Sequence, residues 1–285
     1  MKQFNTPLRY PGGKGRLTQF IADTMQANGL IGGHYAEAYA GGAAVAIGLL
    51  QLEYASHIHI NDVNRSVHAF WHCVLHHSDD LCKRIRKTRI SMTEWHRQRE
   101  IQDLVDVEPL DLAFSTFFLN RTNRSGIIRG GVIGGKKQDG DWKLNARYNK
   151  ADLISRIERI AALKSRISLY QYDAVDFISN AIPEMPSRTL VYLDPPYYVK
   201  GKGLYEDHYA HEDHAHIAKL VPSIRQPWVV SYDNVEPIRK LYCRQRQFFF
   251  GLRYSAQDRY EGSEILVAGP RLTIGEIRPS RAAAA

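Results

Sequence analysis

The residues best suited to chemistry are the run Asp194-Pro195-Pro196-Tyr197, which directly follows the apolar segment 191–193. Such a segment is typical of a buried strand, and open α/β sheets bind ligands at the carboxyl ends of their strands. Two consecutive prolines fix the backbone and remove two amide donors, so the turn is rigid and its carbonyls can accept hydrogen bonds. A carboxylate, a fixed carbonyl and an aromatic ring at one edge suit a flat heterocycle with an exocyclic amino group. The plainer alternative is a strand-ending turn with a buried tyrosine.

The elements that would position this turn follow the order of a doubly wound α/β unit. A strand is expected over 35–39, then a small-residue turn at Ala40-Gly41-Gly42, a buried helix over 43–52, and a strand over 56–60 that ends at Asn61-Asp62. A strand, a glycine turn, a helix and a second strand with an acidic end are the order of such a unit. The pattern returns later, with strands expected over 167–170, 189–193 and 228–231 and an antiparallel pair at 248–251 and 264–268.

The middle of the chain has a different character. Residues 79–119 have a helical pattern, and residues 121–150 contain six glycines and eight Lys or Arg against two Asp. This segment therefore carries six of the eight surplus positive charges of the chain, and its glycines favour a hairpin. We expect a catalytic α/β domain at 1–77 and 166–280, interrupted by a mainly helical domain at 78–165 with a basic hairpin, and a tail at 281–285.

Composition places the chain among globular proteins with an anionic partner. It has 285 residues, 44% of them apolar, and a net charge of +8, which leaves nucleic acid, a membrane surface and a phosphorylated substrate open. It contains no run of 18 apolar residues and no apolar core of a signal peptide. Cys73, Cys82 and Cys243 are too few and too scattered for a disulfide framework or a CxxC metal site. We therefore expect a cytoplasmic, nucleoid-associated protein with no membrane segment and no metal.

The Asp194-Pro195-Pro196-Tyr197 run, in this setting, resembles the catalytic motif of the Dam-type (D12 class) adenine-N6 DNA methyltransferases. Segments 8–14, 37–43, 61–64, 120–126 and 231–234 resemble other motifs of that family, and their order is that of its α group. The resemblance implies a Rossmann-like class I methyltransferase domain with a seven-stranded, mostly parallel sheet and an inserted target-recognition domain. It also implies methyl transfer from S-adenosyl-L-methionine to N6 of a flipped adenine in double-stranded DNA, a reaction typical of restriction-modification enzymes.

The same resemblance implies the cofactor residues. Segment 37–43 resembles the family's Glu-Pro-Phe-x-Gly-x-Gly loop for the methionine part of the cofactor, with Ala38 in place of proline. Asp62 takes the place of the aspartate that accepts from the ribose hydroxyls. Asp173 fits the acidic residue near the adenine ring, although Asp176 is a rival. The implied set is Tyr10, Lys14, Glu37, Ala40, Gly41, Gly42, Asp62, Asn64 and Asp173.

For the substrate, the resemblance implies catalysis by Asp194, Pro195, Pro196 and Tyr197. The N6 hydrogens would face the Asp194 carboxylate and the Pro195 carbonyl, while Tyr197 would stack on the base and Tyr198 or Tyr232 would close its other side. Segment 120–126 resembles the start of the family's recognition hairpin. Phosphate and base-edge contacts are therefore expected from Asn120, Arg121, Asn123, Arg124, Arg129, Lys136, Lys137 and Arg147. A solvated surface loop is the alternative for this segment.

Other interpretations of the chain stay open or fail on spacing. The amine-binding turn also suits cytosine N4 or adenine in RNA, and a DNA-binding protein without catalysis could keep the fold. A small-molecule or protein amine methyltransferase would leave the basic segment unexplained. The histidines of segment 208–216 lack the H-E-x-x-H spacing of a zinc site and have no cysteine nearby. We expect a monomer or a weak dimer.

Overall fold

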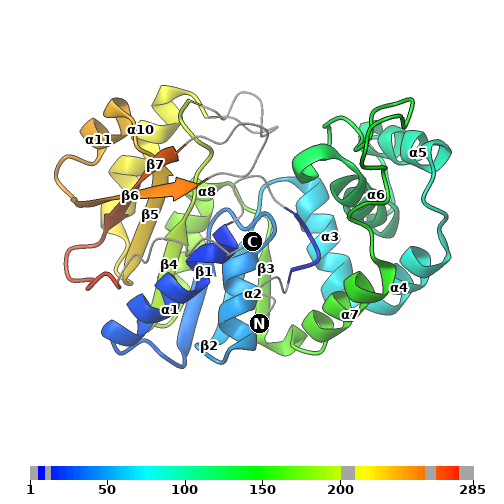
Figure 1. Ribbon diagram of the computed structural model, residues 1–285. Coiled ribbons are helices and arrows are strands. Elements are labelled where there is room, and N and C mark those ends of the chain that lie inside the picture. The colour runs from blue at the N-terminus through cyan, green and yellow to red at the C-terminus, as the bar shows by residue number, and fades with distance from the viewer. Residues whose placement is uncertain (1–5, 10–13, 200–208, 254–260, 276–285) are drawn as a thin grey trace, which may run out of the picture.

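The computed structural model describes residues 6–9, 14–199, 209–253 and 261–275, which form a seven-stranded sheet with helices on both faces and a helical lobe to one side (Figure 1). The sheet order is β3-β2-β1-β4-β5-β7-β6, with β7 antiparallel to both neighbours and the other neighbouring pairs parallel. The first five positions are those of a Rossmann-like sheet, so the expected fold is confirmed. The strands are β1 (Gly33–Glu37), β2 (Ala55–Asn61), β3 (Ile167–Tyr170), β4 (Thr189–Leu193), β5 (Trp228–Asp233), β6 (Arg246–Arg253) and β7 (Glu261–Ala268).

Strand residues alternate between two apolar clusters, one on each face of the sheet. Tyr35 and Tyr192 belong to the first cluster, whereas their neighbours Ala36 and Val191 belong to the second. The first cluster lies under η1 (Lys14–Leu17), α1 (Thr18–Ala27), α2 (Ala44–Gln51) and α3 (Arg65–His76). The second lies under α8 (Ala174–Asp176), η4 (Phe177–Ala181), η5 (Ile182–Glu184), α10 (His211–Leu220), η6 (Val221–Ser223) and α11 (Glu236–Leu241).

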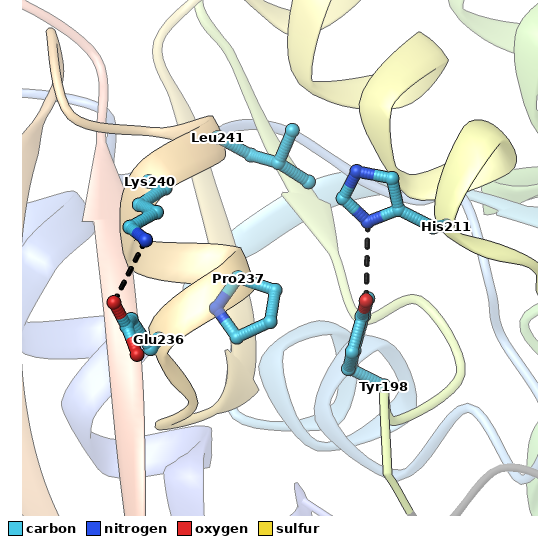
Figure 2. A pocket seen from close by; sticks show the side chains of 6 residues that line it. All are labelled: Tyr198, His211, Glu236, Pro237, Lys240 and Leu241. Atoms are coloured by element: carbon cyan, nitrogen blue, oxygen red, sulfur yellow. Dashed lines mark hydrogen bonds and ion pairs between the residues drawn. The ribbon is translucent and has the colours of Figure 1, made fainter.

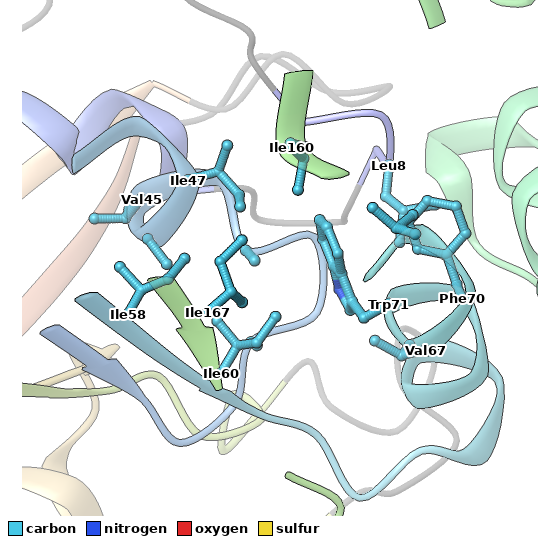
Figure 3. Close-up of a cluster of buried hydrophobic side chains, with 14 of the residues drawn as sticks. Leu8, Val45, Ile47, Ile58, Ile60, Val67, Phe70, Trp71, Ile160 and Ile167 are labelled. Atoms are coloured by element: carbon cyan, nitrogen blue, oxygen red, sulfur yellow. The ribbon is translucent and has the colours of Figure 1, made fainter. Parts of the chain in front are cut away.

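Helix α3 connects the sheet to the helical lobe. In Figure 3, Trp71 and Val67 of α3 approach the isoleucines of β2 and β3, and Ile160 of α7 joins them. Trp71 is fully buried, and the same apolar cluster continues into the lobe. The lobe contains α4 (Ser78–Lys87), α5 (Met92–Asp103), α6 (Pro109–Thr122), η2 (Arg124–Gly126), α7 (Lys150–Ala161) and η3 (Lys164–Arg166). The two parts therefore share one core, and the domain boundaries expected from the sequence stay a prediction.

The glycine-rich segment between α6 and α7 differs from the expected hairpin of paired strands. A single isolated antiparallel bridge, Asn123 with Val132, closes it, and turns fill the rest. The side chain of Gln138 takes the place of hydrogen bonds between paired strands. Its amide nitrogen donates to the carbonyls of Ile133 and Gly135, both at 2.7 Å, and its oxygen accepts from the amide of Leu144 at 2.8 Å. Side-chain bonds to nearby backbone compete with strand pairing in this way.

Gly126 fixes the start of this loop against the N-terminal segment. Its φ is +78°, and a Cβ there would lie 2.4 Å from the carbonyl oxygen of Arg9. We expect Gly126→Ala to lower the free energy of unfolding by more than about 1 kcal/mol, because both the left-handed φ and the contact oppose a side chain. Urea unfolding measures the change.

Gly131 supplies the matched control, since it lies in the same loop with an ordinary φ, and a Cβ added there would meet no atom within 4 Å. We expect Gly131→Ala to leave stability unchanged or to raise it by about 0.4–1 kcal/mol. Equal effects of the two substitutions would contradict the structural role of Gly126.

Candidate active site

Acidic side chains gather at the carboxyl edge of the sheet. Glu37 ends β1, Asp62 directly follows β2, Asp173 follows β3 by three residues and Asp194 directly follows β4. Strands β1 and β4 are neighbours, with Glu37 opposite Tyr192, although helices and strands β2 and β3 separate them in the chain. The strand order reverses between them, and a ligand of an open α/β sheet binds at such a reversal.

Two buried hydroxyl groups fix the carboxylate of Asp194. The Ser231 hydroxyl donates to Asp194 Oδ1 at 2.5 Å, and the Tyr192 hydroxyl lies 2.7 Å from Ser231 Oγ. An ionised carboxylate can only accept, so the single proton of Ser231 points to Asp194 and Tyr192 must donate to Ser231. The β4–β5 register, with Leu193 opposite Val230, places Ser231 beside Asp194. One carboxylate oxygen is therefore held from within the protein.

The end of the turn after Asp194 is anchored to strands β5 and β7. Asp233 accepts from the amides of Tyr198 at 2.9 Å and Val199 at 3.1 Å. The Tyr197 hydroxyl donates to Glu264 Oε1 on β7 at 2.8 Å, and Tyr197 is only 7% exposed. Neither proline donates a hydrogen bond, so these bonds from β5 and β7 set the position of the turn.

A pocket of about 490 Å³ lies beside this turn, between Tyr198, the start of α10 and α11 (Figure 2). The Tyr198 hydroxyl lies 3.1 Å from Nδ1 of His211, and their rings meet edge to face. Tyr232, the other expected wall of a base site, is fully buried, and its hydroxyl lies 3.1 Å from Nδ1 of His214. Tyr232 therefore cannot stack on a base, whereas Tyr198 lines an open pocket. The remaining lining residues are Glu236, Pro237, Lys240 and Leu241.

The glycine turn after β1 is held between β2 and α3. Asp62 Oδ2 accepts from the amide of Gly41 at 2.7 Å, and Trp71 Nε1 donates to the Gly41 carbonyl at 2.9 Å. Gly41 and Ala43 both have left-handed φ values, +46° and +45°. Ala43 adopts a conformation that favours glycine, which indicates that its surroundings impose the shape of this turn.

Glu37 lies buried behind the glycine turn. Its Oε1 accepts from the Tyr35 hydroxyl at 3.1 Å and from the amide of Ala46 at 3.2 Å. Burial raises the pKa of this carboxyl to about 8, and the nearby Asp194 adds to the rise. Glu37 is therefore mostly protonated at neutral pH, and a cation bound beside it would favour its ionised form.

The other implied cofactor residues lie as follows. Asn64 caps α3 by accepting from the amides of Ser66 and Val67, and Ala40 and Gly42 belong to the buried turn. Asp173 caps α8 by accepting from the amide of Val175 at 2.8 Å, while its rival Asp176 lies within that helix. Lys14 begins η1, and its side chain, like the whole of Tyr10, lies outside the described part of the chain.

Three of the expected DNA contacts are buried in the protein. Asn120 accepts from the amide of Arg9 at 2.7 Å and donates to the carbonyls of Arg9 and Gly126. Asn123 accepts from Trp95 Nε1 at 2.7 Å and, like Asn120, has no exposed amide to offer a base edge. Arg121 is 7% exposed. Residues 112–122 of α6 are buried all round and Asn123 is buried at its end, so these three side chains present no exposed group to DNA here, and the contacts expected of them stay a prediction.

The remaining basic candidates are exposed on the loop. Arg129 pairs with Asp103 at the end of α5 at 2.5 Å, and the guanidinium of Arg147 lies 5.8 Å from the ring centre of Trp142. Arg124, Lys136 and Lys137 are also exposed. This part of the loop presents positive charge to solvent.

A family model, D12 class N6 adenine-specific DNA methyltransferase, matches residues 10–254 of the chain. The chain therefore belongs to this family of methyltransferases, whose fold and chemistry imply S-adenosyl-L-methionine as the methyl donor. No curated protein matches the sequence.

Solved structures of low similarity include the "putative RNA methyltransferase PH1948" of Pyrococcus horikoshii, with 11% identity, a TM-score of 0.44 and coverage of 92% of this chain and 87% of that one. The rRNA methyltransferase aviRa of Streptomyces viridochromogenes has 13% identity, a TM-score of 0.38 and coverage of 89% and 84%. Similarity at this level bears on neither substrate nor mechanism.

The donor set at the sheet edge fits S-adenosyl-L-methionine. The carboxyl groups of Glu37 and Asp62 complement its positive sulfonium and ammonium groups and its ribose hydroxyls, and the small residues at 40–43 leave the backbone approachable.

None of the described helices is long and apolar enough to cross a membrane. The described residues also contain no group of three His, Cys, Asp or Glu placed to hold a metal ion.

The raised pKa of Glu37 predicts a dependence of stability on pH. The folded chain keeps a proton that the unfolded chain releases above pH 4.5, so this group lowers stability as the pH rises from about 4.5 to about 8, by up to about 1.4 kcal/mol per pH unit. Glu37→Gln removes this loss while keeping an acceptor for Tyr35 and Ala46. Urea unfolding should therefore show the variant gaining stability over the native chain between pH 5 and pH 8. A difference that is constant over this range would contradict the buried neutral carboxyl.

Proposed function

We propose that this protein transfers the methyl group of S-adenosyl-L-methionine to N6 of an adenine flipped out of duplex DNA. The observation that carries this proposal is the carboxylate of Asp194, fixed by Ser231 beside the strand-order reversal in a chain of the D12 family. The finer claims, adenine over cytosine and DNA over RNA, follow from the family and from the basic loop.

In the proposed reaction, the turn must activate a weak nucleophile, the exocyclic amine of adenine. The lone pair of an exocyclic amine on adenine is delocalised into the ring. Acceptance of its two hydrogens by the Asp194 carboxylate and the Pro195 carbonyl favours a tetrahedral nitrogen whose lone pair is available. When bound, S-adenosyl-L-methionine supplies an electrophilic methyl group on its sulfonium. Asp194 also lies where it can take the proton that the nitrogen loses after it gains the methyl group.

Tyr198, on the same turn as Asp194, offers an aromatic wall for an extruded base at the rim of the pocket between α10 and α11. A flipped base is held by stacking and by hydrogen bonds to its edge. Tyr198 and Pro237 offer flat surfaces, and the bond from Tyr198 to His211 fixes the tyrosine ring. Tyr197 is buried, at 7% exposed, and its hydroxyl is bonded to Glu264. We therefore assign Tyr198, rather than Tyr232, to the second face of the base.

The exposed cations of the loop would bind the phosphate backbone of the duplex. Base flipping costs stacking and pairing energy, which contacts to the DNA backbone offset. We assign this role to cations that are exposed on the loop: Arg124, Arg129, Lys136, Lys137 and Arg147.

Substitution of Asp194 tests the proposed function. We expect Asp194→Ala to lower kcat for methyl transfer to duplex DNA by at least about 10³-fold, while the affinity for DNA changes less than twofold. The assay follows labelled methyl transfer and identifies the methylated nucleoside by mass spectrometry, with RNA as a parallel substrate. Glu158→Ala, an exposed acid on α7, is the control. Retained turnover in Asp194→Ala, or a product other than N6-methyladenine, would overturn the assignment.

Substitution of Ser231 tests how Asp194 is positioned. Ser231→Ala removes the hydroxyl that favours the ionised carboxylate, so we expect kcat to fall about 10- to 100-fold and the acid limb of the pH–rate profile to move up by about one pH unit. Ser231→Thr keeps the hydroxyl and should restore most of both. A lower rate with an unmoved pH profile would mean that Ser231 acts only as packing.

A further inference from the structure

The hydroxyl of Tyr39 connects the glycine turn to the residue that opens the approach to α10. Tyr39 follows β1 by two residues, and its hydroxyl oxygen lies 3.1 Å from that of Tyr209. The two rings meet edge to face, with their centres 6.1 Å apart. The motif that segment 37–43 resembles has phenylalanine at this position. Because phenylalanine packs as well against the second apolar cluster, packing alone does not explain the hydroxyl.

Tyr209 in turn packs against His214, the buried histidine of α10. Their ring centres lie 5.4 Å apart, and His214 is fully buried. Nδ1 of His214 lies 3.1 Å from the hydroxyl oxygen of Tyr232 on β5, so the histidine ring is tied to the sheet. A close-packed ring with one fixed nitrogen has little freedom to move, and Tyr209 therefore rests on a rigid support.

Tyr198 is held by the first turn of the same helix. His211 and His214 are three residues apart, so they lie on one face of α10. The ring of Tyr198 packs against that of His214 with their centres 5.2 Å apart, and its hydroxyl lies 3.1 Å from Nδ1 of His211 (Figure 2). The position of Tyr198, which we assign to the second face of the base, therefore depends on the position of this helical turn.

These contacts form one continuous aromatic chain from the glycine turn to the proposed base site. The aromatic chain consists of Tyr39, Tyr209, His214 and Tyr198. Close-packed side chains pass a displacement to their neighbours, because there is no free space to absorb it. A ligand that fixes the glycine turn therefore also restricts the positions that Tyr198 can adopt.

We propose that Tyr39, Tyr209 and His214 are positioning residues that couple cofactor binding at the glycine turn to the placement of Tyr198 against the target base. This inference rests on the proposed function. Tyr39 is held when the cofactor occupies the turn, and through Tyr209 it then holds the start of α10 and Tyr198 in the place that the base requires. Since coupling between two sites is reciprocal, a bound base raises the affinity for the cofactor by the same factor.

The test compares cofactor affinity with and without the substrate. S-adenosyl-L-homocysteine, which lacks the transferable methyl group, is titrated calorimetrically into the chain alone and into its complex with a duplex that carries the adenine context methylated by the native chain. We expect the duplex to raise the affinity at least about fivefold in the native chain and less than about twofold in Tyr39→Phe and in Tyr209→Phe. The two substitutions remove opposite ends of one contact, so the double variant should lose no more coupling than either single variant.

Tyr54→Phe is the matched control. Tyr54 is partly buried and directly precedes β2, at the amino edge of the sheet, so the substitution removes a tyrosine hydroxyl far from the aromatic chain in the fold. It should keep the native ratio of the two affinities. If Tyr39→Phe does not fold, Tyr209→Phe carries the test, because it breaks the same contact from outside the glycine turn.

The outcomes separate this inference from the proposed function. The inference is wrong if the native affinity does not respond to the duplex, if either variant keeps the native ratio, or if a variant loses affinity equally with and without the duplex. In each of these cases the proposed function stands as long as the native chain methylates adenine in duplex DNA. If the native chain methylates no adenine in duplex DNA, the proposed function fails and this inference fails with it.

Discussion

The hydrogen bonds from Tyr192 through Ser231 to Asp194 are the interaction on which the active edge depends. These side chains lie on the face of the sheet covered by α1 and α2, together with Glu37 and Glu264, where water is largely excluded. Polar groups in such a place must be satisfied by one another, and a satisfied network is rigid. The anchoring of the turn after Asp194 by Glu264 and the neutral state of Glu37 follow from the same constraint.

Much of this arrangement can be predicted from the sequence, because it is local. Apolar strands that end in Glu37, Asp62 and Asp194 predict a sheet edge with carboxylates, and the structure confirms the fold that this requires. The bond between Ser231 and Asp194 depends on the register of β4 and β5, which no local pattern states. The one indication of this bond in the sequence is that polar side chains stand at alternate positions near the end of the otherwise apolar strand β5.

The basic segment shows where residue type misleads. Asn120, Arg121 and Asn123 have the side chains of a DNA reader, but this end of α6 is buried on every side. The two asparagines hold backbone groups of Arg9 and of the following loop. The surplus charge is therefore divided. Exposed cations such as Lys136 face solvent, whereas Arg121 is buried in α6.

The central claim is that this edge methylates the exocyclic amine of adenine in DNA. The most direct measurement is methylation-sensitive sequencing of DNA from cells that express this chain, compared with cells that do not. We expect N6-methyladenine confined to one short sequence context and present only in the expressing cells. Modified cytosine alone, or no new modified base in the DNA, would contradict it.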